Sequence, residues 1–197
     1  LLLTGGHTQV YLMKSENEIE LLGESVDDAI GEAFDKTAKL IGLSYPGGSE
    51  IEQQALKGNE DKFVLPKPLV KEKNFNFSFS GIKTNINHLT KKNIIDKKFV
   101  EDLSASFQKN ITEILIEKLE RGLKRLSSEN KNIRSISVVG GVSNNKYIRN
   151  KIENFFVEKN IEIYYPIKEM MGDNAAMIAW ACMKFYKKDR DDLFFKP

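Results

Sequence analysis

The chain has 197 residues, which suffices for one domain or for one domain and part of another. Its composition, 41% hydrophobic and 29% charged, is that of an ordinary soluble globular protein, and a net charge of +2 excludes the strongly basic balance typical of many nucleic-acid binders. A single cysteine, Cys182, excludes an internal disulfide. Because we find neither a bilayer-length apolar run nor a charged-then-apolar leader, we expect a cytosolic protein without a membrane segment.

The first residues predict a strand that runs directly into a turn. Leu1, Leu2 and Leu3 precede Thr4-Gly5-Gly6, and there is no initiating methionine. We interpret these leucines as the end of a strand whose beginning is absent, and we expect a fragment of a longer protein. Residues 1–3, 9–13 and 19–22 are predicted to form three short strands separated by turns.

A helix is predicted after the third strand. Ser25 followed by Asp28 fits a capping box, Gly42 ends the helix, and a Tyr-Pro-Gly-Gly turn precedes a short helix over about 49–56. The expected inner face of the first helix consists of residues at helical spacing, namely Val26, Ile30, Ala33, Phe34, Thr37 and Ile41.

The middle of the chain combines an irregular stretch with a long helix. Pro66 and Pro68 exclude a regular helix from residues 58–76, and Ser80 begins a short helix. A long helix is expected over about 99–127, with an inner face of Val100, Leu103, Phe107, Ile111, Ile114, Leu115, Leu119 and Leu123.

The last third alternates strands and helices. We predict a buried strand over 133–139, a helix over 145–158, a strand over 161–165 and a closing helix over 174–187. Cys182 lies in the apolar run 177–183 of that closing helix, so we expect it to be buried packing material.

This order of elements predicts an α/β domain with a mixed sheet and flanking helices. It also matches the ribonuclease-H-like lobe of the actin–hexokinase–chaperone ATPase superfamily, whose members pair two such lobes around a nucleotide cleft. We expect residues 1–173 to form one lobe, with an irregular and helical insertion at about 45–98. Residues 174–197 would then be a closing helix and tail that pack on a missing N-terminal lobe.

Two glycine turns are expected at the carboxyl ends of strands, where α/β sheets place ligands. At the first turn, the paired glycines after Thr4 allow backbone N–H groups to approach an anion, and the hydroxyls of Thr4 and Thr8 could add donors. On this turn alone, a plain hairpin turn is the favoured interpretation. At the second, Gly140 and Gly141 lead into a helix N-terminus, where Asn145 would be a cap or a nucleotide ligand.

Charged residues alone give weaker signals. Lysines crowd residues 62–98, which indicates a solvated surface. Asp173, before the closing helix, could be a cap or could bind a cation. His7 and His88 are too far apart in sequence to suggest a metal pair.

Taken together, these segments resemble the TsaD family, the tRNA threonylcarbamoyladenosine transferases formerly described as O-sialoglycoprotein endopeptidases. The resemblance covers nearly the whole chain, and its runs occur in the family's order. The matching runs are Thr4-Gly-Gly-His-Thr-Gln9, Leu22-Gly-Glu-Ser25, Asp27-Asp28, Gly31-Glu-Ala-Phe-Asp-Lys-Thr-Ala-Lys39, Tyr45-Pro-Gly-Gly48, Phe77-Ser-Phe-Ser-Gly-Ile-Lys-Thr84, Gly140-Gly-Val-Ser-Asn-Asn145 and Gly172-Asp-Asn-Ala-Ala-Met177.

The resemblance implies a transferase that moves threonylcarbamoyl from threonylcarbamoyl-adenylate to an adenosine beside the anticodon of tRNAs that read codons beginning with A. A divalent metal, iron or zinc, would hold the donor and polarise its carbonyl. By the same resemblance, tRNA is a partner, and a bacterial enzyme would work with a TsaB-like paralogue and a TsaE-like ATPase, whereas a mitochondrial one would dimerise.

The resemblance also assigns residues. The phosphate and acyl region of the donor would be lined by Leu2, Leu3, Thr4, Gly5 and Gly6. Its adenylate portion would contact Asp35, Gly48 and Asn145, with Asp35 and Glu52 on the ribose, and Asp173 would be a metal ligand. The segment 78–84 would lie near the mouth of the cleft, and the neighbouring lysines could touch tRNA phosphates.

The sequence departs from the family in two respects. Thr4 stands where the family usually has serine, which keeps the hydroxyl. The family's histidine ligands belong to a helix that would precede Leu1, so we expect the chain alone to be inactive. Three alternatives remain: a metalloprotease, for which no segment supplies a zinc and a base; a non-catalytic scaffold paralogue of the same complex; and a sugar kinase or ATPase of the same superfamily.

Overall fold

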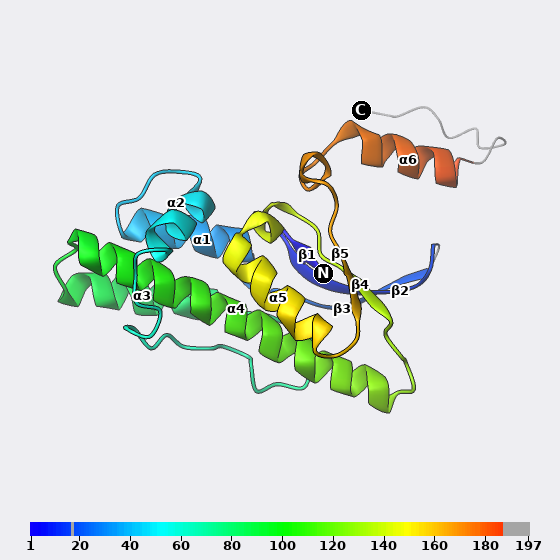
Figure 1. Cartoon of the computed structure of the whole chain (residues 1–197), viewed down its shortest axis with the longest axis horizontal. Helices are drawn as coiled ribbons and strands as arrows, with labels where there is room; N and C mark the ends of the chain where they lie inside the picture. Colours follow the sequence, from blue (N-terminus) through cyan, green and yellow to red (C-terminus); the bar gives the residue numbers. More distant parts are fainter. Residues whose placement is uncertain (17, 187–197) are drawn as a thin grey trace.

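The computed structural model describes residues 1–16 and 18–186 and is a mixed α/β arrangement, as predicted (Figure 1). The predicted end of the closing helix at Lys187, and the tail after it, lie outside these residues. The elements in chain order are β1 (Leu2–Leu3), β2 (Thr8–Ser15), β3 (Glu18–Glu24), α1 (Ile30–Leu40), α2 (Gly47–Ala55), α3 (Ser80–Lys92), α4 (Lys97–Ser128), β4 (Ser135–Ser137), α5 (Lys146–Val157), β5 (Glu162–Tyr164) and α6 (Ala175–Phe185), with 3-10 turns at Gly141–Asn144 and Lys168–Met170.

Within residues 1–16 and 18–186, five strands form two ladders joined through β1. β1, β2 and β3 are antiparallel neighbours, and β4 pairs with β5 in parallel. A parallel bridge between Leu2 and Val139 connects the ladders, with hydrogen bonds from Leu3 N to Val139 O (2.8 Å) and from Val139 N to Leu1 O (2.9 Å). The strand order across both ladders is therefore β3-β2-β1-β4-β5.

The long helix α4 supplies much of the core. Its Leu103, Phe107 and Ile111 are fully buried, and of the inner face predicted from the sequence only Val100 and Leu123 are partly exposed. Phe107 packs edge-on against Phe34 of α1 with ring centroids 5.0 Å apart. Helices α2 and α5 both pack on α4, and α5 crosses α4 (Figure 1). The helical periodicity therefore predicted both the helix and its buried face correctly.

A buried lysine on α4 fixes the irregular segment between α2 and α3. The amine of Lys118 donates to the backbone oxygens of Asn74 (3.2 Å) and Glu72 (3.5 Å) and to Asn74 Oδ1 (3.2 Å). Burial lowers the pKa of this amine, although the charge of Glu72 acts in the opposite direction. Because a buried polar group must be hydrogen-bonded, these carbonyls hold the loop against α4.

The predicted start of the first helix is wrong by several residues. α1 begins at Ile30 with Ala29 as its cap, and Glu32 Oε2 accepts from Ala29 N at 3.3 Å. Ser25 Oγ donates to Asp28 O instead of capping a helix. Val26 is accordingly 60% exposed and does not belong to the inner face. The Ser-x-x-Asp spacing marks a turn in this protein, because a serine hydroxyl can hydrogen-bond the backbone of a turn as readily as the backbone at a helix end.

The prediction that Cys182 is buried is also wrong. Cys182 is exposed, and α6 buries none of its residues, although it is strongly apolar. Trp180 is 52% and Met183 is 72% exposed. Figure 1 shows α6 standing away from the sheet and the other helices; its Lys184 amine lies 3.2 Å from a carboxylate oxygen of Glu16 beside the β2–β3 turn. Apolar periodicity identified a helix face but not what covers it. Within the described ranges, no helix combines the length and apolarity needed to cross a bilayer.

Candidate functional site

A pocket of about 310 Å³ gathers residues from four distant parts of the sequence. It lies where α1, α2, the first glycine turn and the 3-10 turn after Gly140 meet. Of the nine substrate-contacting residues predicted above, this pocket brings together Gly5, Asp35, Gly48, Glu52 and Asn145. The other lining residues are Gly31, Phe34, Pro46, Ser49, Gly141, Val142 and Asn144.

Asp35 presents a carboxylate to this pocket from the α1 face opposite the core. Its Oδ1 accepts a hydrogen bond from Gly47 N at 2.8 Å, which ties the N-terminus of α2 to α1. A Cβ on Gly47 would lie 2.6 Å from Ala38 Cβ and 2.9 Å from Asp35 Cα, so this junction requires glycine. The close contact of α1 with α2 thus fixes both the position and the orientation of the Asp35 carboxylate.

The opposite wall is built around the start of α5. Asn145 is the N-cap of α5, since its Oδ1 accepts from Ile148 N at 3.0 Å. Its Nδ2 donates to Oε1 of Gln108, a buried residue on α4, at 2.8 Å. Glu52 Oε1 accepts from Lys146 N at 2.7 Å, so the next backbone N–H of the same helix end is also satisfied. These bonds hold Asn145 and Glu52 in fixed positions at the pocket.

The first glycine turn approaches the pocket through Gly5 alone. Thr4 Oγ1 accepts from His7 N (2.8 Å) and Gly6 N (3.2 Å), so two turn amides are already bonded within the turn. Gly5 lies against α1, where a Cβ on Gly31 would be 2.7 Å from Gly5 Cα. The turn is therefore held by its own threonine and by the close approach of α1.

The remaining residues predicted at this turn lie elsewhere. Leu3 is fully buried in the core, Leu2 lines a different cavity, and neither Thr4 nor Gly6 lines the pocket. The suggestion that Thr8 donates to an anion is wrong, because its buried hydroxyl accepts from Ile30 N at 2.8 Å and anchors the start of α1.

The second glycine turn has the conformation that only glycine adopts easily. Gly140 has φ 99°, and Ser143 Oγ donates back to its carbonyl oxygen at 2.6 Å. The turn redirects the chain from β4 to α5, so that Gly141, Val142 and Asn145 all reach the pocket. This agrees with the predicted placement of a glycine turn between a strand and a helix N-terminus.

Asp173 stands apart from this pocket. It is exposed, and the helix that follows is capped by Asn174, whose Oδ1 accepts from Met177 N at 2.9 Å. In the described part of the chain, no group of three or more histidine, cysteine, aspartate or glutamate side chains could hold a metal ion. One exposed carboxylate does not by itself fit a divalent-metal site, which needs several ligands.

The segment 78–84 does not line the pocket but is anchored by an aspartate. Asp27 accepts hydrogen bonds from Ser78 Oγ (2.6 Å), Ser80 Oγ (2.7 Å) and Phe79 N (2.8 Å), which fixes the start of α3. Burial alone would raise the pKa of Asp27, but these hydrogen bonds outweigh it and hold the pKa below its usual range. Asp27 thus acts as an anion at a helix N-terminus.

We expect Asp27 to stabilise the fold in a pH-dependent way. Since its folded-state pKa is depressed, its contribution is fully present above the unfolded pKa of about 3.9 and is lost as the pH falls through the lower folded value. Asp27→Asn should lower the free energy of unfolding by about 1 kcal/mol at pH 7, a modest value because Asp27 is partly exposed to solvent.

Urea unfolding of both proteins at pH 7, 5 and 3 measures this difference. The difference in the free energy of unfolding between wild type and Asp27→Asn should be constant from pH 7 to 5 and should shrink at pH 3. Asp61→Asn, at an exposed carboxylate paired with Lys109, serves as a control. A gap that stays the same at pH 3 would show that the charge of Asp27 does not matter.

The lysines of residues 62–98 are divided between two environments. Lys67 forms ion pairs with Glu113 (2.9 Å) and Glu117 (2.6 Å), and Lys98 pairs with Asp102 at 2.8 Å. Lys91 and Lys92 are exposed at the end of α3. The prediction that these lysines form a solvated surface is therefore correct for Lys91 and Lys92. Lys67 instead helps to hold the irregular segment on α4.

Sequence reasoning missed Gln108 and Gly31 as parts of this site. A signal for Gln108 was present: Ser104, Gln108 and Thr112 recur every four residues along α4, and all three are buried. A polar stripe within the buried face of a helix indicates polar partners across the interface. Gly31 carries no such signal, because its role depends on the approach of a turn that precedes it by 26 residues.

Comparisons with known proteins agree on one family. The family model of TsaD, tRNA N6-adenosine threonylcarbamoyltransferase, matches residues 1–180. Curated relatives named tRNA N6-adenosine threonylcarbamoyltransferase include that of Thermosipho africanus, which is 46% identical over 95% of this chain and 56% of the relative. The relative of the same name from Brucella suis is 43% identical over 92% of this chain and 51% of the relative. That of Wolbachia pipientis wMel is 39% identical over 100% of this chain and 58% of the relative. The chain thus spans about half the length of the curated relatives it matches.

Proposed function

Because the chain belongs to the tRNA N6-adenosine threonylcarbamoyltransferase family, we propose that it carries the donor-binding pocket of a longer enzyme that modifies tRNA. The enzyme would transfer threonylcarbamoyl from threonylcarbamoyl-adenylate to the adenosine 3′ of the anticodon in tRNAs that read codons beginning with A. A bond forms between the exocyclic amine of adenine and the carbamoyl carbon, and the bond from that carbon to the phosphate oxygen breaks. The amine loses a proton, and AMP leaves.

One observation carries this proposal. Five of the nine residues that the family resemblance assigns to the donor line a single pocket of about 310 Å³, namely Gly5, Asp35, Gly48, Glu52 and Asn145. These residues span 140 positions of the sequence, so only the tertiary structure brings them together. The match between the assigned residues and the pocket supports an adenylate site.

The side chains in this pocket suit a nucleotide. Gly5 and Gly48 have open space where a Cβ would lie, so a flat or charged group can approach the backbone there. The Asp35 carboxylate keeps Oδ2 free of any hydrogen bond within the described residues and could accept from a ribose hydroxyl. Asn145 and Glu52 stand at the start of α5, the electropositive end of that helix. These residues would bind and orient the donor.

We further propose that the fold is one ribonuclease-H-like lobe of the actin–hexokinase–chaperone superfamily. The strand order β3-β2-β1-β4-β5, with β2 antiparallel to its neighbours and β1, β4 and β5 parallel, supports this assignment. The pocket lies at the carboxyl ends of β1 and β4, where open α/β sheets bind ligands. A second lobe, belonging to the remaining length of the relatives, would close the cleft.

Metal binding and partners are also proposals. Asp173 would be one ligand of a divalent metal, iron or zinc, whose other ligands would come from outside the described residues; such an ion supplies Lewis-acid polarisation of a carbonyl. The partners would be tRNA, a TsaB-like paralogue and a TsaE-like ATPase, in the cytoplasm. Exposed lysines such as Lys91 and Lys92 suit contacts with tRNA phosphates.

A threonylcarbamoylation assay on the full-length polypeptide tests the transferase. It would contain threonylcarbamoyl-adenylate, unmodified tRNA and the partner subunits, and nucleoside mass spectrometry would measure modified adenosine. We expect wild type and Asp61→Asn to modify tRNA, and both Asp35→Asn and Asp173→Ala to lose most of the activity. Asparagine at position 35 keeps an oxygen that can accept from Gly47 N. Loss of activity in a folded Asp35→Asn protein would therefore show that the activity needs the negative charge of the carboxylate.

Two outcomes would reject this proposal. No modification by a folded wild-type protein with its partners present would favour the scaffold paralogue, especially if the protein stimulated another subunit. Phosphoryl transfer to a small alcohol without tRNA would instead favour a kinase of the same superfamily.

A further inference from the structure

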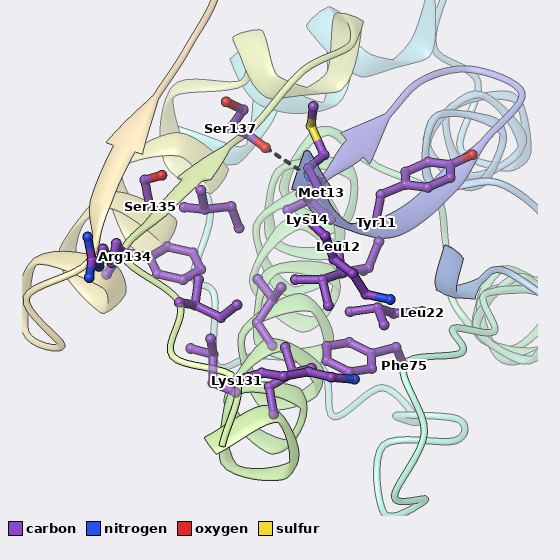
Figure 2. Close-up of a pocket in the computed structure, with 18 of the residues that line it drawn as sticks. Tyr11, Leu12, Met13, Lys14, Leu22, Phe75, Lys131, Arg134, Ser135 and Ser137 are labelled. Atoms are coloured by element: carbon purple, nitrogen blue, oxygen red, sulfur yellow. Dashed lines mark hydrogen bonds between the residues drawn. The ribbon is translucent and has the colours of Figure 1, made fainter. Parts of the chain in front are cut away.

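One polar side chain of α4 reaches the pocket of about 310 Å³ from behind. Gln108 is 4% exposed, and its Oε1 accepts from Asn145 Nδ2 at 2.8 Å. Farther along, α4 lines a larger cavity of about 800 Å³ beside β2 and β4, and there it presents leucines, on the same cavity as Leu22 and Phe75 (Figure 2). A buried amide costs free energy unless it is hydrogen-bonded, so the glutamine points to a role at Asn145.

The backbone sets the direction of the hydrogen bonds at Asn145. Ile148 N can only donate, so the amide atom of Asn145 that lies 3.0 Å from it is the oxygen Oδ1. The other end of the amide is then Nδ2, and only an acceptor suits the position beside it. Gln108 supplies that acceptor with Oε1. The helix cap and the glutamine thus hold the two ends of one planar amide, which fixes the plane of the Asn145 side chain.

This arrangement leaves one hydrogen of Nδ2 for a ligand. An asparagine amide has two N–H donors, and Gln108 takes one of them. Among the described residues, none accepts from the second N–H, and Asn145 lines the pocket. Asp35 and Glu52 line it too, and an ionised carboxylate only accepts hydrogen bonds. The pocket therefore combines one fixed N–H donor with carboxylate acceptors.

We propose that Gln108 is a positioning residue, which holds the Asn145 amide so that its second N–H meets an acceptor atom of the bound nucleotide. This inference rests on the proposed function for the identity of the ligand. Gln108 acts through Asn145, because it lines a neighbouring cavity of about 570 Å³ and not the pocket itself. Without the glutamine oxygen, the cap alone would hold Asn145, and its N–H could turn away from the ligand.

Three variants of the full-length polypeptide test this role by their affinity for AMP, measured by titration calorimetry. Gln108→Leu removes the acceptor and should weaken AMP binding roughly tenfold. Gln108→Glu keeps an oxygen beside Asn145 and should bind AMP within about threefold of wild type. Ser104→Ala is the matched control, because it removes a buried hydroxyl of α4 that has no hydrogen-bond partner among the described residues. Its affinity for AMP should equal that of wild type.

A second measurement needs no nucleotide. In wild type, the side-chain amide protons of Asn145 should exchange slowly with solvent, because the residue is 7% exposed and one proton is bonded to Gln108. Gln108→Leu should speed this exchange about tenfold or more, whereas Gln108→Glu and Ser104→Ala should not. A purely structural role of Gln108 would lower the thermal midpoint of Gln108→Leu but would change neither the Asn145 amide nor the affinity of the folded protein.

The two measurements separate this proposal from the proposed function. Equal AMP affinity of folded wild type and Gln108→Leu would overturn the role of Gln108, even for an active transferase. Equal losses in Gln108→Leu and Gln108→Glu would also overturn it, because packing and not the acceptor would then matter. No AMP binding by wild type would reject the adenylate pocket. Exchange at Asn145 would then decide alone: faster exchange in Gln108→Leu supports the positioning role, and unchanged exchange overturns it.

Discussion

Gly140→Ala is expected to lower the free energy of unfolding by about 3 kcal/mol, because it combines backbone strain with overpacking. Gly140 has φ 99°, a conformation that costs any residue with a Cβ. An added Cβ would also overlap with the carbonyl oxygen of Leu3 in β1 and lie 2.8 Å from Thr4 Cγ2 in the turn after it. The clash involves backbone, so relief requires β1 and β4 to separate beside the pocket of about 310 Å³.

Gly141→Ala is the matched control for this prediction. A Cβ on Gly141 meets nothing within 4 Å, and Gly141 has no positive φ. Its free energy of unfolding should change by less than about 0.5 kcal/mol, although Gly141 lines the pocket. Urea unfolding of wild type, Gly140→Ala and Gly141→Ala measures the change in the free energy of unfolding that each substitution causes. Equal stability of the two variants would contradict the argument from strain.

Gly122→Ala is expected to destabilise the fold by about 3 kcal/mol, the upper range for overpacking. In an exposed helix the same change stabilises by about 1 kcal/mol. Here the new Cβ would overlap with Cε1 of Phe75, whose ring is buried against α4. A decrease in the free energy of unfolding, instead of the increase usual for this substitution, would therefore show that α4 and the irregular segment are in tight contact at Gly122.

A double-mutant cycle with Phe75→Leu tests this contact. Leucine lacks the outer ring atoms that the alanine methyl would meet, so the double variant should be more stable than the sum of the two single changes predicts, by at least about 1 kcal/mol. Gly81→Ala, where a Cβ would be 3.4 Å from Pro68, is the glycine control within α3. Strict additivity of Gly122→Ala and Phe75→Leu would show that the ring does not limit this position.

Local patterns predicted the elements of this fold well. The spacing of Leu103, Phe107 and Ile111 indicated α4 and its buried face, because helical periodicity depends only on neighbours along the chain. The strand over 133–139 was predicted too long, since only Ser135–Ser137 pair with β5. Strand length depends on the partner strand, which a single segment does not reveal.

The candidate site could be predicted only in part. Resemblance assigned Asp35 and Asn145, and the structure brings both to one pocket. It did not reveal that Gln108 holds the amide of Asn145 or that Gly31 lets α1 approach Gly5. Such contacts between distant segments exist only after folding, whereas the errors at Thr8 and Cys182 arose from assigning a role to a residue before its neighbours were known.

The exposure of α6 makes Cys182 a convenient spectroscopic handle. It is the only thiol in the sequence, and it is accessible, so maleimide chemistry attaches one probe at one place. Trp180, two residues away, is the only tryptophan and would quench or transfer energy to a nearby dye. Labelling at this position would therefore test whether α6 docks on the remainder of a longer polypeptide, without introducing or removing any other cysteine.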